Sequence, residues 1–326
     1  SVYGEAVRVS KELGTTLCLY DEYGFPSGSA GAINGDGIPR FANAYPDDTI
    51  KRLDKHEEIV TGPRFYQKDL PAGKLMACVA MESRSGKRID LSKDGIEGGK
   101  IRWQVPEGKW KIMSFLCVKD GDPNVDYLNY DACRKFVGMT HQKYFDHFGN
   151  EFGPGKTIDG VFFDETTLYR AKGRIWTGNF NEKFEARHHF SPALLYPALW
   201  CDIGLDTQAA RNLMFGMRAE LYASGFAKCV QDWCREHGGI AATGHQDQEE
   251  IINPCNVSGD LMKCFKHQDI PGIDKIGGPR GTEAFYKVVS SSANNYDKPL
   301  VMSETYGALG NIGVDQLYQI AMDQYA

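Results

Sequence analysis

Several features that mark common classes of protein are missing from this sequence. Basic residues are not in excess, because 37 Lys and Arg stand against 43 Asp and Glu, which gives a formal net charge of −6. This balance lacks the positive footprint of a nucleic-acid-binding protein. The longest apolar run, at 192–200, is far shorter than the roughly 20 residues of a membrane-spanning helix. We therefore expect neither a nucleic acid nor a membrane among the partners.

Short motifs of phosphate and serine chemistry are also missing. Residues 149–157 look like a phosphate-binding loop, but Asn150 stands where the motif needs glycine, and the segment precedes a predicted strand instead of following one. No serine has glycine at both positions that a nucleophile elbow requires. No Gly-rich dinucleotide turn follows a strand either. These absences disfavour phosphate binding and a serine hydrolase.

The nine cysteines form no recognisable framework. Their number is odd, and their spacing does not match a small disulfide scaffold. Cys255, Cys264 and His267 lack the short paired spacing of a structural zinc site. We expect mostly reduced core cysteines, which favour the cytoplasm, while a secreted or periplasmic location stays open.

The sequence does contain a repeated alternation of short apolar runs with helical patterns. Continuous apolar runs predict strands that are covered on both faces, and their alternation with helices predicts a parallel α/β sheet. The predicted strands are 15–20, 125–129, 158–165, 240–245, 273–276 and 299–304. The longer helices are predicted at 131–149, 206–237 and 281–294.

Acidic residues recur at the carboxyl ends of these strands, which favours a (β/α)8 TIM-like barrel. A doubly wound sheet also binds ligands at strand ends, but it usually carries a Gly-rich phosphate turn. The sequence predicts six strands, whereas such a barrel has eight. We therefore expect an incomplete barrel whose first and last strands lie outside the chain. Residues 57–118 predict a small antiparallel β subdomain, inserted between barrel segments 1–56 and 119–326.

Carboxylates are the chemically active groups at these strand ends. The pairs Asp21-Glu22 and Asp164-Glu165 and the single Glu304 each end an apolar strand. Like charges on one rim repel each other unless a ligand, a cation or a proton relieves them. Two carboxyl groups, one protonated and one ionised, are what glycoside hydrolysis requires. For any single acid of this set, a helix cap or a loop-bracing hydrogen bond is the alternative role.

The neighbouring side chains are compatible with a sugar site. Tyr23 and Tyr306 could stack on the C–H faces of a sugar, or could simply pack in the core. His245 could hydrogen-bond a sugar hydroxyl or brace a loop, and its four-residue spacing from Glu249 is a weak pattern for a metal site. Pro26 and the glycines around it predict a stiff loop after the first strand.

Taken together, these stretches resemble the large bacterial α-L-rhamnosidases, specifically the calcium-associated, inverting family and its relatives. The resemblance rests on LYDEYGFPSGSAG, VPEGKWKIMSF, GVFFDET, TGHQDQEE, DIPGIDKIGG and VMSETYGALG. It implies a TIM-like catalytic barrel, a carbohydrate substrate and further domains of a longer chain. It also implies that Ca²⁺ could meet the sugar, although the metal ligands are unknown.

The resemblance implies roles for individual residues as well. Related barrel glycosidases carry their two carboxylates after the fourth and seventh strands, which here are Glu165 and Glu304. We expect Glu165 to be the general acid and Glu304 the catalytic base, or the nucleophile if the anomeric configuration is retained. The residues expected to hold sugar hydroxyls or a cation are Asp21, Glu22, Tyr23, Asp164, His245, Glu249, Asp274 and Tyr306.

Two other functions stay open at this point. The same barrel could bind carbohydrate without cleaving it. Alternatively, His245 and the acids could serve a metal-dependent hydrolase or lyase.

Overall fold

The computed structural model describes residues 1–31, 37–246, 249, 254–276 and 286–325. These residues divide into two compact units. The first unit contains Ser1–Thr49, Pro123–Leu168 and Ala219–Ala326, and the second contains Ile50–Asp122 and Tyr169–Arg218.

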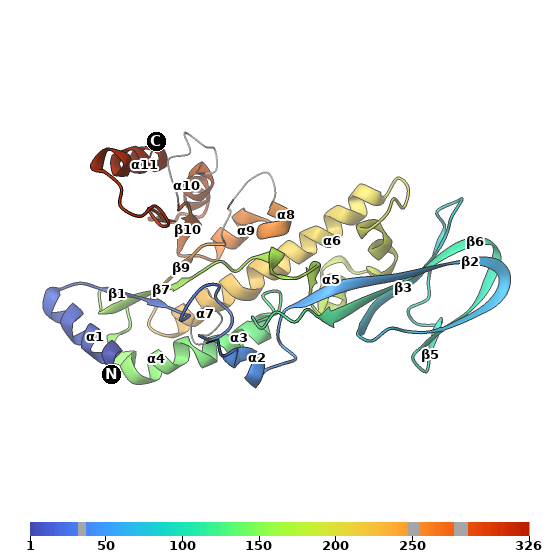
Figure 1. Ribbon diagram of the computed structural model, residues 1–326, viewed down its shortest axis with the longest axis horizontal. Helices are drawn as coiled ribbons and strands as arrows, with labels where there is room; N and C mark the ends of the chain where they lie inside the picture. The colour runs from blue at the N-terminus through green and yellow to red at the C-terminus, as the bar shows by residue number, and fades with distance from the viewer. Residues whose placement is uncertain (32–36, 247–248, 250–253, 277–285, 326) are drawn as a thin grey trace. The chain divides into compact units, whose positions relative to one another are not determined.

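A five-stranded parallel sheet forms the centre of the first unit (Figure 1). Its strands pair side by side in the order in which they occur along the chain. They are β1 (Leu17–Tyr20), β7 (Ile158–Phe163), β9 (Ala241–Gly244), β10 (Ile270–Asp274) and β11 (Met302–Glu304). The predicted α/β class is therefore confirmed, and five of the six predicted strands lie in one sheet.

The sixth predicted strand, at 125–129, is wrong. Without it, Glu165 follows the second strand of this sheet and Glu304 ends the fifth, so the count that put these acids after the fourth and seventh barrel strands does not hold. Val125 forms one isolated bridge with Thr49, and the chain then turns. Tyr127 is buried, and its hydroxyl donates to the carbonyl oxygen of Ser27 at 2.6 Å. The segment is apolar because it packs beneath the loop that follows β1, and its polar groups bond to that loop instead of to a neighbouring strand.

Helices surround the parallel sheet. The first unit contains α1 (Val2–Leu13), α2 (Arg40–Ala44), α3 (Tyr130–Met139), α4 (His141–Phe148), α7 (Lys228–Glu236), α8 (Pro254–Val257), α9 (Leu261–Lys266), α10 (Tyr286–Asn295), α11 (Val314–Tyr325) and the end of α6 (Thr207–Tyr222). None of the described helices has both the length and the apolar character needed to cross a membrane. The eight described cysteines are not paired in disulfides.

Two predicted helices are interrupted for local reasons. The helix predicted at 131–149 breaks at Thr140, whose backbone leaves the helical region at φ −111° and ψ −86°. The helix predicted at 206–237 contains a π-helical turn, Ala223–Ala227. A side chain on Gly225 would begin 2.1 Å from the carbonyl oxygen of Tyr127, so the close approach of these two segments requires glycine. Of the helix predicted at 281–294, the part before residue 286 lies outside the described residues.

Aromatic packing joins the helices to the sheet. The ring centroid of Phe226, in the π-helical turn, lies 5.5 Å from those of Tyr127 and Phe163 and 5.6 Å from that of Phe136. All four rings are buried. Burying such a side chain stabilises a fold by about 1.5–3 kcal/mol, so this cluster fixes β7, and with it the residues at its carboxyl end.

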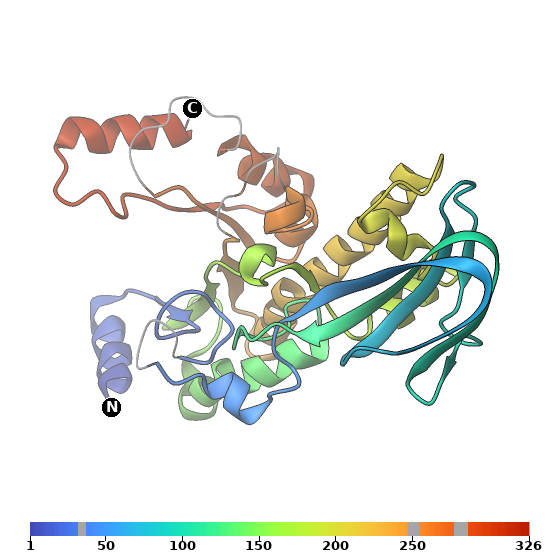
Figure 2. The ribbon, with the colours of Figure 1, turned by 45° about the vertical axis from the view of Figure 1, so that its right-hand side comes forward.

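The second unit is built on an antiparallel sheet in the order β4-β3-β6-β2-β8, with β5 paired to β6. The long strands of this sheet are the blue and blue-green arrows of Figure 2. The strands are β2 (Lys51–Asp69), β3 (Lys74–Glu82), β4 (Arg88–Asp90), β5 (Ile96–Glu97), β6 (Lys100–Lys119) and β8 (Arg174–Trp176), and α5 (Phe180–His188) follows. The sheet extends beyond the predicted limits 57–118. Residues 169–218, which the prediction placed in the barrel, cluster with this sheet because β8 pairs with the start of β2.

Candidate active site

The carboxyl ends of the parallel strands gather acidic residues at one edge of the sheet. Asp164 follows β7, His245 follows β9, and Asp274 and Glu304 end β10 and β11. Asp274 and Glu304 are partners in the register of β10 and β11. Because parallel strands present their carboxyl ends on the same side, residues far apart in the sequence meet here.

The imidazole of His245 joins two of these acids. Its Nε2 lies 2.7 Å from Oε2 of Glu304 and 3.1 Å from Oδ1 of Asp164. His245 is fully buried, whereas the side chains of Asp164 and Glu304 are 15% and 44% exposed. The cluster therefore has a buried centre and one solvent-exposed carboxylate.

His245 is held in its charged form. Burial alone lowers the pKa of the imidazole, but the hydrogen bonds with Asp164 and Glu304, together with the charge of Glu249, raise this pKa to about 10. At neutral pH an imidazolium ion thus lies between the two carboxylates and orients both.

A buried ion pair supports the other side of His245. Oε1 of Glu249 lies 4.0 Å from Nδ1 of the imidazole and accepts a hydrogen bond from the amide of Gln246 at 2.8 Å. Its Oε2 accepts from the amide of Asp274 at 3.0 Å and lies 3.6 Å from Nζ of Lys275. Burial raises the pKa of Glu249, and the charges of His245 and Lys275 oppose that increase. Glu249 therefore stabilises the charged imidazole from the buried side of the cluster, and it has no exposed surface.

The ion pair predicts a stability effect. Lys275→Met should lower the free energy of unfolding by about 2 kcal/mol, because it removes a buried cation from a carboxylate that keeps its other hydrogen bonds. The control is Lys11→Met, which removes a pair between Lys11 and Glu151 whose lysine side chain is 54% exposed; such pairs contribute about 0–1 kcal/mol. Urea unfolding monitored by circular dichroism measures both, and equal effects of the two substitutions would contradict a structural role for Lys275.

Asp164 is fixed by residues on and after β1. Its Oδ2 accepts a hydrogen bond from the hydroxyl of Tyr20 at 2.9 Å. Its amide donates to Oγ of Ser27 at 2.8 Å, and its carbonyl oxygen accepts from the amide of Ser27 at 2.8 Å. The Ser27 hydroxyl in turn donates to Oδ1 of Asp21 at 2.5 Å. Ser27 therefore links the acidic segments that follow β1 and β7 by hydrogen bonds. No motif in the sequence indicated this role.

The two acids after β1 have different environments. Asp21 is buried, and this burial, with the neighbouring charges of Glu22 and Asp164, raises its pKa well above the usual range, although the hydrogen bond from Ser27 opposes the shift. The carboxylate of Glu22 accepts from the amides of Gly28, Ser29, Ala30 and Gly31. Glu22 thus braces its own loop, which is the alternative role that the sequence left open.

Two predicted site residues have strained backbones. Glu165 has φ 48° and Tyr306 has φ 68°, a region that non-glycine residues rarely adopt and that is enriched at functional sites. Glu165 directly follows Asp164, so it lies at the same sheet edge as Glu304. The hydroxyl of Tyr306 donates to the carbonyl oxygen of Leu317 at 3.2 Å.

The predicted site residues fall into two neighbouring groups. Those at the sheet edge are Asp164, Glu165, His245, Glu249, Asp274, Glu304 and, two residues further along, Tyr306. Those on the loop after β1 are Asp21, Glu22 and Tyr23. Within the segment 245–250, residues 247, 248 and 250 lie outside the described residues.

One oxygen or nitrogen from each of Asp164, His245 and Glu304 lies within 4.8 Å of the others, which is close enough to share a cation. Ca²⁺ takes six to eight ligands, all of them oxygen, so a set that contains an imidazole nitrogen does not fit it. Two carboxylates and a neutral imidazole instead suit a transition metal, which would have to displace the proton that His245 carries between Asp164 and Glu304.

The parallel sheet and its acid-rich edge define an α/β protein with a site suited to acid–base chemistry. The sequence profile of the alpha-L-rhamnosidase family, glycoside hydrolase family 106, matches residues 49–315. The chain therefore belongs to this family, and the resemblance read from its motifs is confirmed.

A solved structure resembles the fold. It is a rhamnosidase from Novosphingobium sp. PP1Y, which matches 73% of this chain with a TM-score of 0.55 and 20% sequence identity. The match covers 24% of that protein, so this chain spans about a quarter of its length. No curated protein gives a significant match.

Proposed function

We propose that this chain forms part of the catalytic region of a glycoside hydrolase that cleaves α-L-rhamnosyl bonds. Membership of the alpha-L-rhamnosidase family supports the substrate class. The observation that carries the proposal is the contact of His245 with both Asp164 and Glu304, because it gathers acids from separate strands at one sheet edge. Glu165 lies at that edge, directly beside Asp164 in the chain.

In this mechanism Glu165 is the general acid and Glu304 the base. Glu304 takes a proton from a water molecule whose oxygen attacks the anomeric carbon, and Glu165 gives its proton to the glycosidic oxygen as the C–O bond breaks. The His245 hydrogen bond fixes the Glu304 carboxylate, while the 44% exposure of this side chain leaves it accessible to water. Because the water attacks from the face opposite the leaving group, the anomeric configuration is inverted.

We also assign the five parallel strands to a TIM-like barrel that further strands complete. The spatial order of the strands follows the chain order, so every crossover connection moves in the same direction. A barrel requires such an order, whereas a doubly wound sheet reverses direction at a switch point. Tyr23 and Tyr306, which are 74% and 39% exposed, retain ring surface that supports a role in stacking on sugars.

An assay with 4-nitrophenyl α-L-rhamnopyranoside tests this function in the enzyme that carries this chain. We expect release of nitrophenol and of rhamnose, and no release from the corresponding β-D-glucoside. Binding of rhamnose by calorimetry without any product by chromatography would instead indicate a carbohydrate-binding protein. Activity that a chelator abolishes, and that a transition metal but not calcium restores, would favour a metal-dependent hydrolase, for which the Asp164–His245–Glu304 cluster is the candidate site.

A further inference from the structure

We propose that a cavity beside β1 is a second sugar subsite, which binds the residue attached to the rhamnosyl unit and uses Asp21 as its polar contact. This inference rests on the proposed function, because it assigns a further part of the substrate to the same enzyme.

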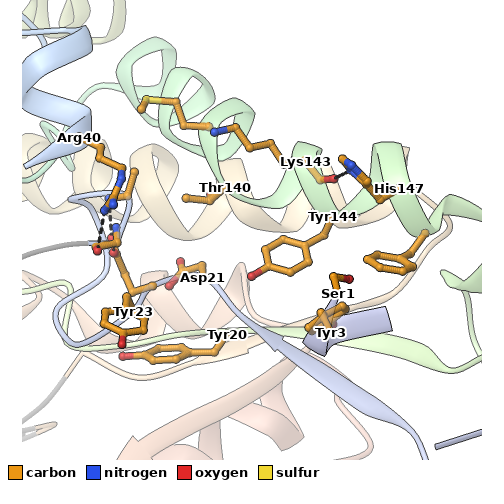
Figure 3. Close-up of a pocket in the computed structure, with 15 residues that line it drawn as sticks. Ser1, Tyr3, Tyr20, Asp21, Tyr23, Arg40, Thr140, Lys143, Tyr144 and His147 are labelled. Carbon is orange, nitrogen blue, oxygen red and sulfur yellow. Dashed lines mark hydrogen bonds between the residues drawn. The ribbon is translucent and has the colours of Figure 1, made fainter. Parts of the chain in front are cut away.

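The cavity has the size and the walls of a sugar-binding site. Its volume is about 720 Å³, within the range of roughly 300–1,000 Å³ that small-molecule pockets occupy. Tyr3 of α1 and Tyr144 of α4 lie on one side of the cavity (Figure 3). Phe148 of α4 also lines it. The ring centroid of Tyr3 lies 4.8 Å from that of Tyr144 and 5.4 Å from that of Phe148. Such clustered rings offer apolar faces to the C–H groups of a sugar.

Asp21 has an unsatisfied polar atom beside this cavity. The residue lines the cavity and is only 4% exposed. Its Oδ1 is bonded to Ser27, whereas its buried Oδ2 has no hydrogen-bond partner among the described residues. Leaving such a buried oxygen unpaired is unfavourable, because its lost contact with water is not replaced. In Figure 3 the hydroxyl of Tyr144 extends towards Asp21 across the cavity, so a sugar hydroxyl between them would meet two polar groups.

Tyr20 connects the cavity with the acid cluster. The residue lines the cavity, and its hydroxyl donates to Asp164 at 2.9 Å. The other oxygen of Asp164 lies 3.1 Å from His245, which contacts Glu304. The cavity therefore shares a side chain with the proposed catalytic edge, as a subsite for the neighbouring sugar requires.

Equilibrium binding tests the subsite without the need for turnover. In a Glu304→Gln background, which prevents hydrolysis, calorimetry compares methyl α-L-rhamnopyranoside with the disaccharide α-L-rhamnosyl-(1→6)-D-glucose. We expect the disaccharide to bind at least tenfold more tightly. Tyr144→Ala removes one ring of the aromatic wall, and Met139→Trp fills the cavity from α3. Each substitution should reduce the ratio of the disaccharide and methyl rhamnoside binding constants to about one.

The controls separate the possible outcomes. Tyr318→Ala removes a tyrosine of α11 that is 66% exposed and lies outside the cavity, and it should leave the ratio unchanged; thermal melting confirms that each variant is folded. If methyl rhamnoside binds and the disaccharide gains nothing, or if both cavity variants keep the gain, the subsite is wrong while the proposed function stands. If neither probe binds, the proposed function fails together with the subsite.

Discussion

The single substitutions Glu304→Gln and Glu165→Gln should each lower kcat on an α-L-rhamnoside by about a thousandfold. A positioned acid or base contributes about 10²–10⁴-fold to the rate of such a reaction. Glutamine has nearly the same shape as glutamate, and its carbonyl oxygen can still accept the hydrogen bond that His245 makes with residue 304. The substitution therefore removes the proton transfer and preserves the arrangement of the cluster. Steady-state kinetics with 4-nitrophenyl α-L-rhamnopyranoside measure the effect.

A matched control for these variants is Glu12→Gln. Glu12 lies on α1, its side chain is 62% exposed, and it pairs with Arg8, so its loss should leave kcat unchanged. Wild-type turnover in both the Glu165 and the Glu304 variants would exclude the two-carboxylate mechanism. Loss of activity in only one of them would exclude the other residue from its assigned role.

The unfolding free energy should fall by about 3 kcal/mol between pH 6.5 and pH 9 because of His245. Folding raises the pKa of this imidazole from 6.5 to about 10, so the folded state binds a proton that the unfolded state releases above pH 6.5. The resulting stabilisation is fully present below about pH 6.5 and is lost as the pH rises towards 10. Each unit of pKa shift corresponds to about 1.4 kcal/mol, which sets the size of the effect.

Urea unfolding at pH 6.5 and pH 9 checks this prediction in the wild type and in His245→Gln. Glutamine keeps a hydrogen-bonding side chain but cannot bind the proton, so the variant should lose most of the pH dependence over this interval. A variant whose stability falls as steeply as that of the wild type would assign the effect to other groups, and would contradict a charged imidazole between Asp164 and Glu304.

Much of the first unit could be predicted from the sequence because its central strands, β7, β9 and β10, are largely buried. Continuous apolar runs such as 158–165 have few alternatives to a strand in a covered parallel sheet, and the acid that ends each run marks the sheet edge. The same criterion failed at 125–129, since an apolar run also arises where a loop is packed beneath another loop. Only the hydrogen bonds of Val125 and Tyr127 separate the two cases.

The supporting contacts of the site could not be predicted from the sequence. Ser27 joins Asp21 to Asp164, which lies 137 residues beyond Ser27 in the chain, and Lys275 pairs with Glu249 inside the first unit; neither contact has a sequence pattern. Glu22 is predicted to hold a sugar hydroxyl or a cation. The sequence could not show that its carboxylate accepts from four amides of its own loop, an arrangement that depends on the folded path of residues 28–31.

The residue boundaries of the antiparallel unit also could not be predicted from the sequence. The antiparallel strands predicted between residues 57 and 118 are present as parts of β2 to β6, although β6 is one continuous strand over residues that the sequence divides by a turn. The three residues of β8 are too few to give a pattern of their own, yet their pairing with β2 brings residues 169–218 into this unit. Long-range pairing of a short strand is decided by tertiary packing and not by local preference.

A crystal structure of the Glu304→Gln variant with an uncleaved rhamnoside would test the central claim most directly. We expect the glycosidic oxygen to lie about 2.6–3.2 Å from the carboxyl group of Glu165. Residue 304 should lie on the opposite face of the sugar, with about 6.5–9.5 Å between the two side-chain groups, as inversion requires. A rhamnosyl unit bound away from β7 and β11, or with both side chains on one face, would contradict the central claim.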